Sequence, residues 1–285
     1  MRRRRSAAAL LVTALVAGAV ALSGCGGVTG GPAALTPKVS PPVVVRSGQL
    51  SVAVDLSYPP FAATTSQGDV GWDVDVAAAL ADRLGLKLVV VDAKPDAAAK
   101  LLAAKKVDVV MGDLSIAKAL DLDVAFAGSY ASDAPAVFAS KGATVSVDAL
   151  GARRIAVQKG SEAYWQLSDT YGEQALMLYP TLREAMGAVA GGQADVVAGD
   201  ALVGAYMLRD FPKLAFAGQL APASPVGVGV STDAPKLEDA VRTALDDMSS
   251  QGILSTLRRK WVGDLPQLKA PGVESSASVG ATVAP

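Results

Sequence analysis

The sequence predicts an α/β fold built from mostly parallel sheets that are flanked by helices. Two observations lead to this prediction. Apolar residues change their spacing from every second to every fourth position along the chain, and strand-like and helix-like runs then alternate from residue 50 to residue 230. Sheets of this kind bind ligands at the carboxyl ends of their strands, so the same pattern predicts a crevice there.

The first elements show the change of period most clearly. Alternating apolar residues predict a strand over 50–54, which ends at a turn-rich stretch over 57–60. Apolar residues then recur every four positions from 73 to 84, and Gly85 follows, so we expect a helix that ends there. Further strands are expected over 86–91, 107–111, 155–157, 175–178, 196–198 and 226–230, with a helix over 96–104 and helical runs between the later strands.

Two stretches of the chain resemble each other. Residues 103–110 and 190–197 both place a helix end, a turn and an aspartate before an apolar strand. This repetition predicts two lobes of similar design.

The first 24 residues have the pattern of a signal peptide. Arg2 to Arg5 form a basic start, and the uncharged apolar stretch over 7–22 is shorter than the about 20 residues that cross a bilayer. Leu22-Ser23-Gly24-Cys25 resembles a bacterial lipobox, in which the cysteine receives a lipid and becomes the mature N-terminus. We expect an extracytoplasmic protein anchored to the outer face of the cell membrane by Cys25; the alternative is ordinary secretory cleavage beside an incidental cysteine.

Two segments lack apolar periodicity. Residues 25–46 contain Gly-Gly and Pro-Pro pairs, which predict a flexible tether, and residues 265–285 repeat this character and predict a disordered tail. The folded part is therefore expected over 47–264.

Composition excludes several classes of function. The net charge is -1, and Lys and Arg are scattered through the mature chain, so we expect no nucleic-acid partner. The chain has no histidine and one cysteine, which removes His/Cys zinc sites, Ser-His-Asp and Cys-His nucleophiles and histidine acid-base catalysis. We expect no metal, no cofactor and no enzymatic activity; an enzyme would have to rely on carboxylates.

Five motifs, in order and at compatible spacing, resemble the family 3 extracytoplasmic solute-binding proteins, which bind polar amino acids and opines. They are Gly48 to Val52 with Tyr58-Pro59-Pro60-Phe61, Gly71 to Val76, Lys105-Lys106-Val107-Asp108, Val157-Gln158-Lys159-Gly160-Ser161, and Gln193 to Asp200. The resemblance implies a two-lobed type II periplasmic-binding-protein fold and an ABC permease as partner, and we expect a monomer.

The family fold also implies where the lobes lie. Lobe 1 is expected over 47–138 plus 226–264 and lobe 2 over 139–225. Glycines and prolines near 140–142 and 222–227 suit the two segments of a hinge, although ordinary turns have the same composition.

The sequence departs from the family at positions that recognise an amino acid. Family members grip the ligand carboxylate with an arginine after the third strand, where this chain has Leu120, and Lys118 offers a point charge nearby. At the second aromatic stacking position this chain has Pro95. The identity of the ligand is therefore open.

The resemblance assigns six candidate ligand-binding residues: Tyr58, Asp113, Ser115, Ser161, Glu162 and Asp200. Asp113 would repel a ligand carboxylate. Glu162 is equally explained as an acid in the first turn of a helix, and Asp200 matches the ammonium-binding acid of the family but also suits a helix N-cap. Three acids without a facing arginine predict a cationic ligand, with Tyr58 stacking on it and Phe61 and Trp72 in the core.

The sequence therefore predicts a substrate-binding lipoprotein of an ABC transporter that captures a small polar solute, an amino acid or related amine. Two alternatives stay open: a ligand-sensing or scaffold lipoprotein of the same fold, and a hydro-lyase resembling cyclohexadienyl dehydratase.

Overall fold

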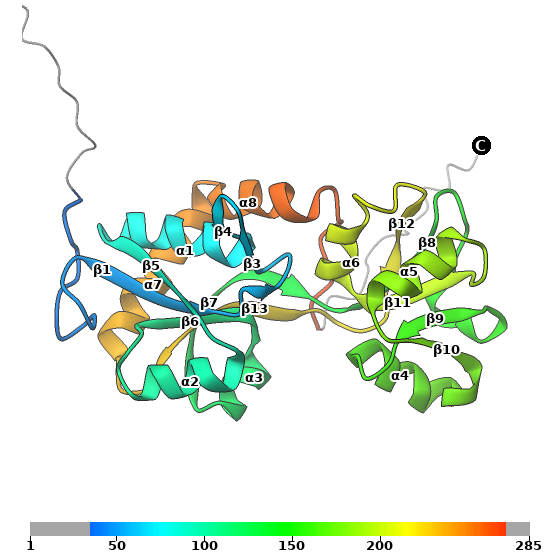
Figure 1. Ribbon diagram of the computed structural model, residues 1–285, viewed down its shortest axis with the longest axis horizontal. Coiled ribbons are helices and arrows are strands. Elements are labelled where there is room, and N and C mark those ends of the chain that lie inside the picture. The colour runs from blue at the N-terminus through cyan, green and yellow to red at the C-terminus, as the bar shows by residue number, and fades with distance from the viewer. Residues whose placement is uncertain (1–34, 272–285) are drawn as a thin grey trace, which may run out of the picture. The chain divides into compact units, whose positions relative to one another are not determined.

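The computed structural model describes residues 35–271, apart from the side chain of Lys118. Within this range the chain forms two five-stranded sheets, each flanked by helices (Figure 1). In order across the first sheet, the strands are β5 (Lys87–Asp92), β1 (Gln49–Val54), β6 (Val109–Ser115), β13 (Ser224–Ser231) and β7 (Val124–Asp133). In the second they are β10 (Leu176–Tyr179), β9 (Ile155–Gln158), β11 (Val196–Asp200), β8 (Pro135–Ser140) and β12 (Leu214–Gln219). A small third sheet holds β2 (Ser57–Tyr58), β3 (Ala62–Thr65) and β4 (Gly68–Val70).

The two large sheets have the same design. β1 pairs in parallel with β5 and β6, and β9 pairs in parallel with β10 and β11. The fourth strands, β13 and β8, are antiparallel, so the sheets are mixed and not purely parallel. Each of these two strands enters directly from the other sheet, which explains why its direction is reversed.

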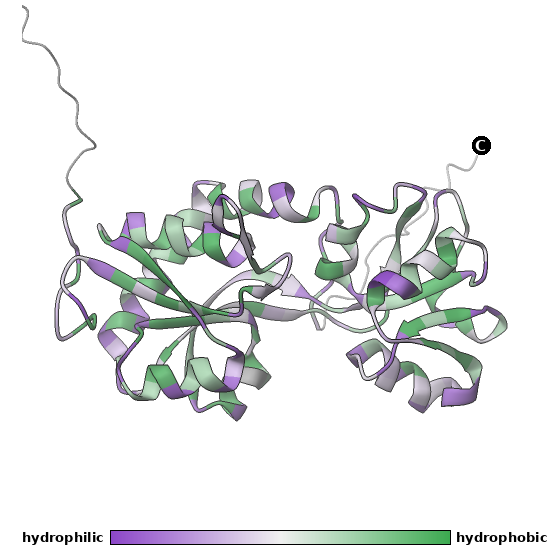
Figure 2. Ribbon diagram, in the orientation of Figure 1, coloured by the Kyte–Doolittle hydropathy of each residue, from purple (hydrophilic) through white to green (hydrophobic). Residues whose placement is uncertain are grey.

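Helices cover both large sheets. On the first sheet, α1 (Trp72–Arg83) and α8 (Ile253–Val262) lie on one side and α2 (Pro95–Ala103) and α3 (Ile116–Asp121) on the other, while α7 (Pro235–Ser250) contacts α1 and α8 (Figure 1). On the second sheet, α4 (Glu162–Tyr171), α5 (Leu182–Ala190) and α6 (Ala201–Met207) pack against the strands. Figure 2 shows apolar strands between helices that carry their polar residues outward. Within residues 35–271, no helix combines the length and the apolar character needed to cross a membrane.

The first strand and helix form where their periodicity predicts them. Five of the six residues of β1 are buried, and Val76 and Leu80 of α1 face the core. Gly85 ends the helix with a φ of 68°, and a Cβ there would lie 1.9 Å from the Thr36 carbonyl oxygen. Only glycine allows both this left-handed turn and the close approach of the preceding chain.

The two similar stretches occupy equivalent places in the two sheets. Asp108 precedes β6 and accepts a hydrogen bond from the Ser51 N–H at 2.7 Å. Asp195 precedes β11 and accepts one from the Arg154 N–H at 2.8 Å. The aspartate before β6 thus holds the start of β1 in place, and the aspartate before β11 does the same for β9.

The chain crosses between the sheets earlier than the sequence predicts. β8 belongs to the second sheet, so the first crossover lies at 133–135 and not near 140–142. The return crossover lies at 219–224 instead of 222–227. The physical reason is that the buried apolar run 136–139 pairs with β11 on one side and with β12 on the other, which places it in the second sheet.

The folded part extends beyond the predicted limits of 47 and 264. Val44 is buried, and the Val45 N–H donates to Asp108 Oδ1 at 2.6 Å, so the end of the predicted tether packs on the first sheet. Leu265 and Leu268, placed in the tail by the sequence, are also buried. The predicted signal peptide, Cys25 and the tail beyond 271 lie outside the described residues.

Candidate functional site

A cleft of about 860 Å³ is lined by residues of both large sheets and of the small one. It lies where several strands end, as expected for an α/β sheet. All six residues that the sequence selected line it: Tyr58, Asp113, Ser115, Ser161, Glu162 and Asp200.

Tyr58 forms an aromatic wall of the cleft. Its ring stacks on Phe61 with 5.4 Å between centroids, and Phe61 stacks on Trp72 at 6.5 Å. Phe61 and Trp72 are fully buried, as predicted, whereas Tyr58 is 38% exposed. The stack therefore fixes the tyrosine ring from inside the fold and leaves part of it accessible to a ligand.

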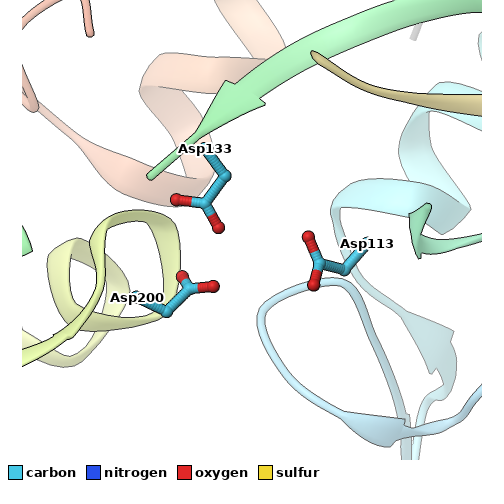
Figure 3. Close-up of side chains that lie close together, drawn as sticks. All are labelled: Asp113, Asp133 and Asp200. Atoms are coloured by element: carbon cyan, nitrogen blue, oxygen red, sulfur yellow. The ribbon is translucent and has the colours of Figure 1, made fainter. Parts of the chain in front are cut away.

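Three carboxylates converge in the cleft. Asp113 comes from β6, Asp133 from the end of β7 and Asp200 from the end of β11. One carboxylate oxygen of each lies within 4.8 Å of the other two. Figure 3 shows the three side chains pointing from different directions into one space. These oxygens are also close enough to share a metal ion. Ca²⁺ takes about six to eight oxygen ligands, so the three carboxylate oxygens alone would not complete its coordination.

A bend in β6 positions Asp113. Gly112 and Asp113 have φ values of 124° and 53°, in a region that aspartate tolerates better than most residues. The pairing of β6 with β13 shifts its register between Gly227 and Gly229. Irregularities of this kind redirect side chains near functional sites, and this one lies beside Asp113.

Asp133 is the acid that the sequence analysis missed. The residue is only 9% exposed, and its Oδ1 accepts hydrogen bonds from the N–H groups of Ala134 at 2.8 Å and Leu202 at 3.2 Å. Burial raises the pKa of its carboxyl well above the usual value, and the neighbouring carboxylates of Asp200 and Asp113 raise it further. No family motif covers this position; an aspartate at the end of an apolar strand, two residues before Pro135, was the available signal.

The structure confirms one of the two sequence-based interpretations of Asp200, the helix N-cap, and its role in ligand binding stays a prediction. Asp200 is the N-cap of α6, where its Oδ1 accepts a hydrogen bond from the Val203 N–H at 2.7 Å. It also lines the cleft. A carboxylate that caps a helix is held in one orientation, which suits a group that faces a ligand.

The turn between β9 and α4 forms the opposite wall. The Ser161 hydroxyl accepts a hydrogen bond from the Tyr164 N–H at 3.1 Å and donates to the Gln158 carbonyl at 2.9 Å. This hydroxyl is therefore engaged in capping α4. Glu162 is the first residue of the helix and lines the cleft beside it.

Two cationic side chains also line the cleft, and the sequence analysis selected neither. They are Lys159 and Arg183. The Arg183 guanidinium pairs with Asp210 at 2.6 Å. Leu120, which the sequence analysis places at the position of the family arginine, lies on α3 with 75% of its surface exposed and is outside the described lining of the cleft. Among the residues whose side chains are described, the lining thus carries four carboxylates and two cations.

Comparison with known proteins agrees with this architecture. The model of the bacterial extracellular solute-binding proteins, family 3, matches residues 50–264. The chain belongs to this family. Among solved structures, the chain is similar to an ancestral cationic amino acid solute-binding protein, with 26% sequence identity and a TM-score of 0.67 over 75% of this chain and 96% of that protein. The type II periplasmic-binding-protein fold predicted from the motifs is confirmed.

Two curated relatives of this family 3 protein are named as binding proteins. The putative ABC transporter arginine-binding protein 2 of Escherichia coli (strain K12) is 27% identical over 215 residues, which are 73% of this chain and 88% of the relative. The lysine/arginine/ornithine-binding periplasmic protein of the same organism is 25% identical over 224 residues, 74% of this chain and 86% of the relative. Both names describe binding proteins and not enzymes.

Proposed function

We propose that this family 3 protein is the extracytoplasmic substrate-binding protein of an ABC transporter, and that it captures a cationic polar solute, an amino acid or a related amine. The convergence of Asp113, Asp133 and Asp200 in the cleft is the observation that carries the proposal. Tyr58, Ser115 and Glu162 complete the proposed binding surface.

The electrostatics of the cleft support a cation. Partly buried carboxylates are costly unless a partner charge or hydrogen bonds compensate them. Arg183 pairs with Asp210 and does not pair with the cluster in any described ion pair. A cationic solute in the cleft would interact favourably with these carboxylates. The relatives named for arginine or for lysine, arginine and ornithine point to the same class of ligand.

The proposal includes the anchor and the partner. Lipidation of Cys25 would hold the protein at the outer face of the membrane, where a monomer could deliver its solute to an ABC permease. Mass spectrometry of the mature protein tests the anchor: we expect an N-terminal cysteine carrying a diacylglyceryl group, and an unmodified N-terminus would contradict it.

Thermal unfolding tests the binding class. The purified protein is heated with arginine, lysine, putrescine, agmatine, glutamine or glutamate. A ligand that binds only the folded state stabilises it by about 2.7 kcal/mol at 100 times its Kd, so we expect a higher melting temperature with at least one of the cations. Stabilisation by glutamate or glutamine alone would show that the solute is not cationic.

A further inference from the structure

The chain that follows α8 connects the two large sheets in addition to the two crossovers. α8 packs on the first sheet, and from Gly263 the chain runs between the sheets, where Figure 1 shows it in orange-red. Lys269 then bonds to Gln219, the last residue of β12 in the second sheet. We call residues 265–269 the strap. The family model matches residues 50–264, so the strap lies just beyond the matched part of the chain.

The start of the strap is held by α8 and by burial. Arg258 of α8 donates hydrogen bonds from its Nη2 to the carbonyl oxygens of Leu265 and Pro266, the latter at 2.9 Å. Leu265 and Leu268 are 5% and 7% exposed, so this stretch of five residues buries two apolar side chains. Apolar burial of this kind favours a docked segment over a free chain end.

The end of the strap is held by the second sheet through its backbone. The side-chain amide of Gln219 bonds to both backbone groups of Lys269. Its Oε1 accepts from the Lys269 N–H at 2.7 Å, and its Nε2 donates to the Lys269 carbonyl at 2.9 Å. The Ala223 N–H donates to the same carbonyl at 2.8 Å. These bonds fix the strap against β12 and against the return crossover 219–224.

α8 itself also contacts the second lobe. Arg209, which follows α6, donates from its Nη2 to the Trp261 carbonyl at 2.9 Å. The Trp261 ring lies 6.2 Å from the Tyr206 ring of α6, and its Nε1 donates to Asp75 of α1 at 2.7 Å. The helix from which the strap starts is thus bound to both lobes. α8 and the strap therefore form one continuous connection beside the two crossovers.

This connection adjoins residues that line the cleft. Pro222 and Ser224 line it, and Ala223 between them bonds to the strap. Met207 of α6 also lines it, one residue after Tyr206. Lobes joined by a hinge rotate about a few residues of the connecting segments. The bonds of the strap restrict the rotations that are open to these lobes, because they tie one of the two connecting segments to the chain that leaves α8.

We propose that the strap is a third link between the lobes, which holds the return crossover against the end of α8 and so sets how far the cleft opens when no solute is bound. Gln219, Leu268 and Lys269 are positioning residues in this account, and none of them has to touch a solute. The inference goes beyond the proposed function, because it concerns the protein without its solute.

Distances between the lobes, measured by pulsed electron spin resonance, test the link. Spin labels are attached at Lys100→Cys on α2 and Asp169→Cys on α4, which are exposed residues of the two lobes, with Cys25→Ser in the same chain. Gln219→Leu removes both bonds from this side chain to Lys269. Each hydrogen bond contributes a factor of about 2 to 10 to an equilibrium, so we expect the population of other interlobe distances to rise by about 5- to 100-fold.

Two further variants show whether the strap is responsible. Gln219 also donates to the Ala221 carbonyl, so Leu268→Ala loosens the strap from its own side and is expected to broaden the distances as well. Gln251→Leu is the matched control, because Gln251 accepts a hydrogen bond from Arg83 within the first lobe. Its distances are expected to equal those of the parent labelled chain. A lower melting temperature with unchanged distances in Gln219→Leu and Leu268→Ala would show that the strap only adds stability, and the inference would be wrong.

Amide hydrogen exchange of the native protein decides the question if a variant does not fold. Detachment of the strap exposes the N–H groups of both Lys269 and Ala223, so we expect the two to exchange at similar rates, each at least about 5-fold more slowly than in a free chain. Exchange of both at the rate of a free chain would show that the strap is detached in solution and would overturn the inference. No solute is present in these measurements, so their outcome leaves the proposed function untouched.

Discussion

The buried carboxyl of Asp73 gives a quantitative test of the structure. Asp73 lies in the first turn of α1 and is fully buried. The Tyr130 hydroxyl donates a hydrogen bond to its Oδ1, whereas Oδ2 has no hydrogen-bond partner among the described residues. Burial is the main cause that raises the pKa of this carboxyl from 3.8 to about 7.

The sign and size of the effect follow from linkage. Below pH 3.8 the carboxyl is protonated in both the folded and the unfolded chain, so its ionisation does not affect stability. As the pH rises toward 7, the unfolded chain releases the proton and the folded protein keeps it, so the free energy of unfolding falls. A shift of about three units corresponds to roughly 4 kcal/mol once the pH exceeds 7.

Asp73→Asn removes the ionisation and keeps an oxygen that accepts the Tyr130 hydrogen bond. We expect its free energy of unfolding, relative to the native protein, to increase by up to roughly 4 kcal/mol between pH 4 and pH 8. Urea unfolding at several pH values measures this difference, with Asp246→Asn on the exposed face of α7 as the control. A difference that is the same at every pH would refute the reasoning.

Four further outcomes follow from the same structure. Asp200→Ala is expected to cost about 1 kcal/mol of stability through loss of the α6 cap and to abolish stabilisation by cations, and retained binding would remove it from the site. Leu268→Ala is expected to lower the free energy of unfolding by about 2–5 kcal/mol if this leucine packs as described, and an unchanged melt would contradict that packing. Gly204→Ala places a Cβ 2.3 Å from the Phe138 ring, so a loss of about 1–3 kcal/mol is expected in the same assay, whereas equal stability would contradict this contact. Binding of a cation is expected to release protons from Asp133, whose neighbours are Asp113, Asp200 and Tyr58, and to strengthen as the pH rises; calorimetry in buffers of different ionisation enthalpy measures the protons, and a value of zero would contradict the coupling.

The sequence predicted the site best where a motif coincides with the end of a strand. Asp113 and Asp200 lie at or near the carboxyl ends of β6 and β11, and parallel strands in equivalent positions bring such residues to one edge of each sheet. The sequence analysis did not select Asp133, because β7 is antiparallel to its neighbour and the end of this strand carries no family motif. Its place in the cleft depends on the crossover between the sheets, which periodicity does not locate.

The limits of the fold were harder to predict than its elements. Strands and helices such as β1 and α1 repeat their apolar spacing over several residues, whereas Val44 and Leu268 are single buried side chains in segments rich in proline. The residues that follow them bond to partners that are distant in the sequence. The Val45 N–H donates to Asp108 Oδ1, and the Lys269 N–H donates to Gln219 Oε1 at 2.7 Å. Contacts of this kind leave no local pattern.

A crystal structure of the protein with putrescine would test the proposed capture of an amine most directly. We expect one ammonium nitrogen within about 3 Å of a carboxylate oxygen of Asp113, Asp133 or Asp200, with the alkyl chain against Tyr58. An ammonium bound outside this cleft, or a nitrogen that contacts none of the three carboxylates, would contradict the account.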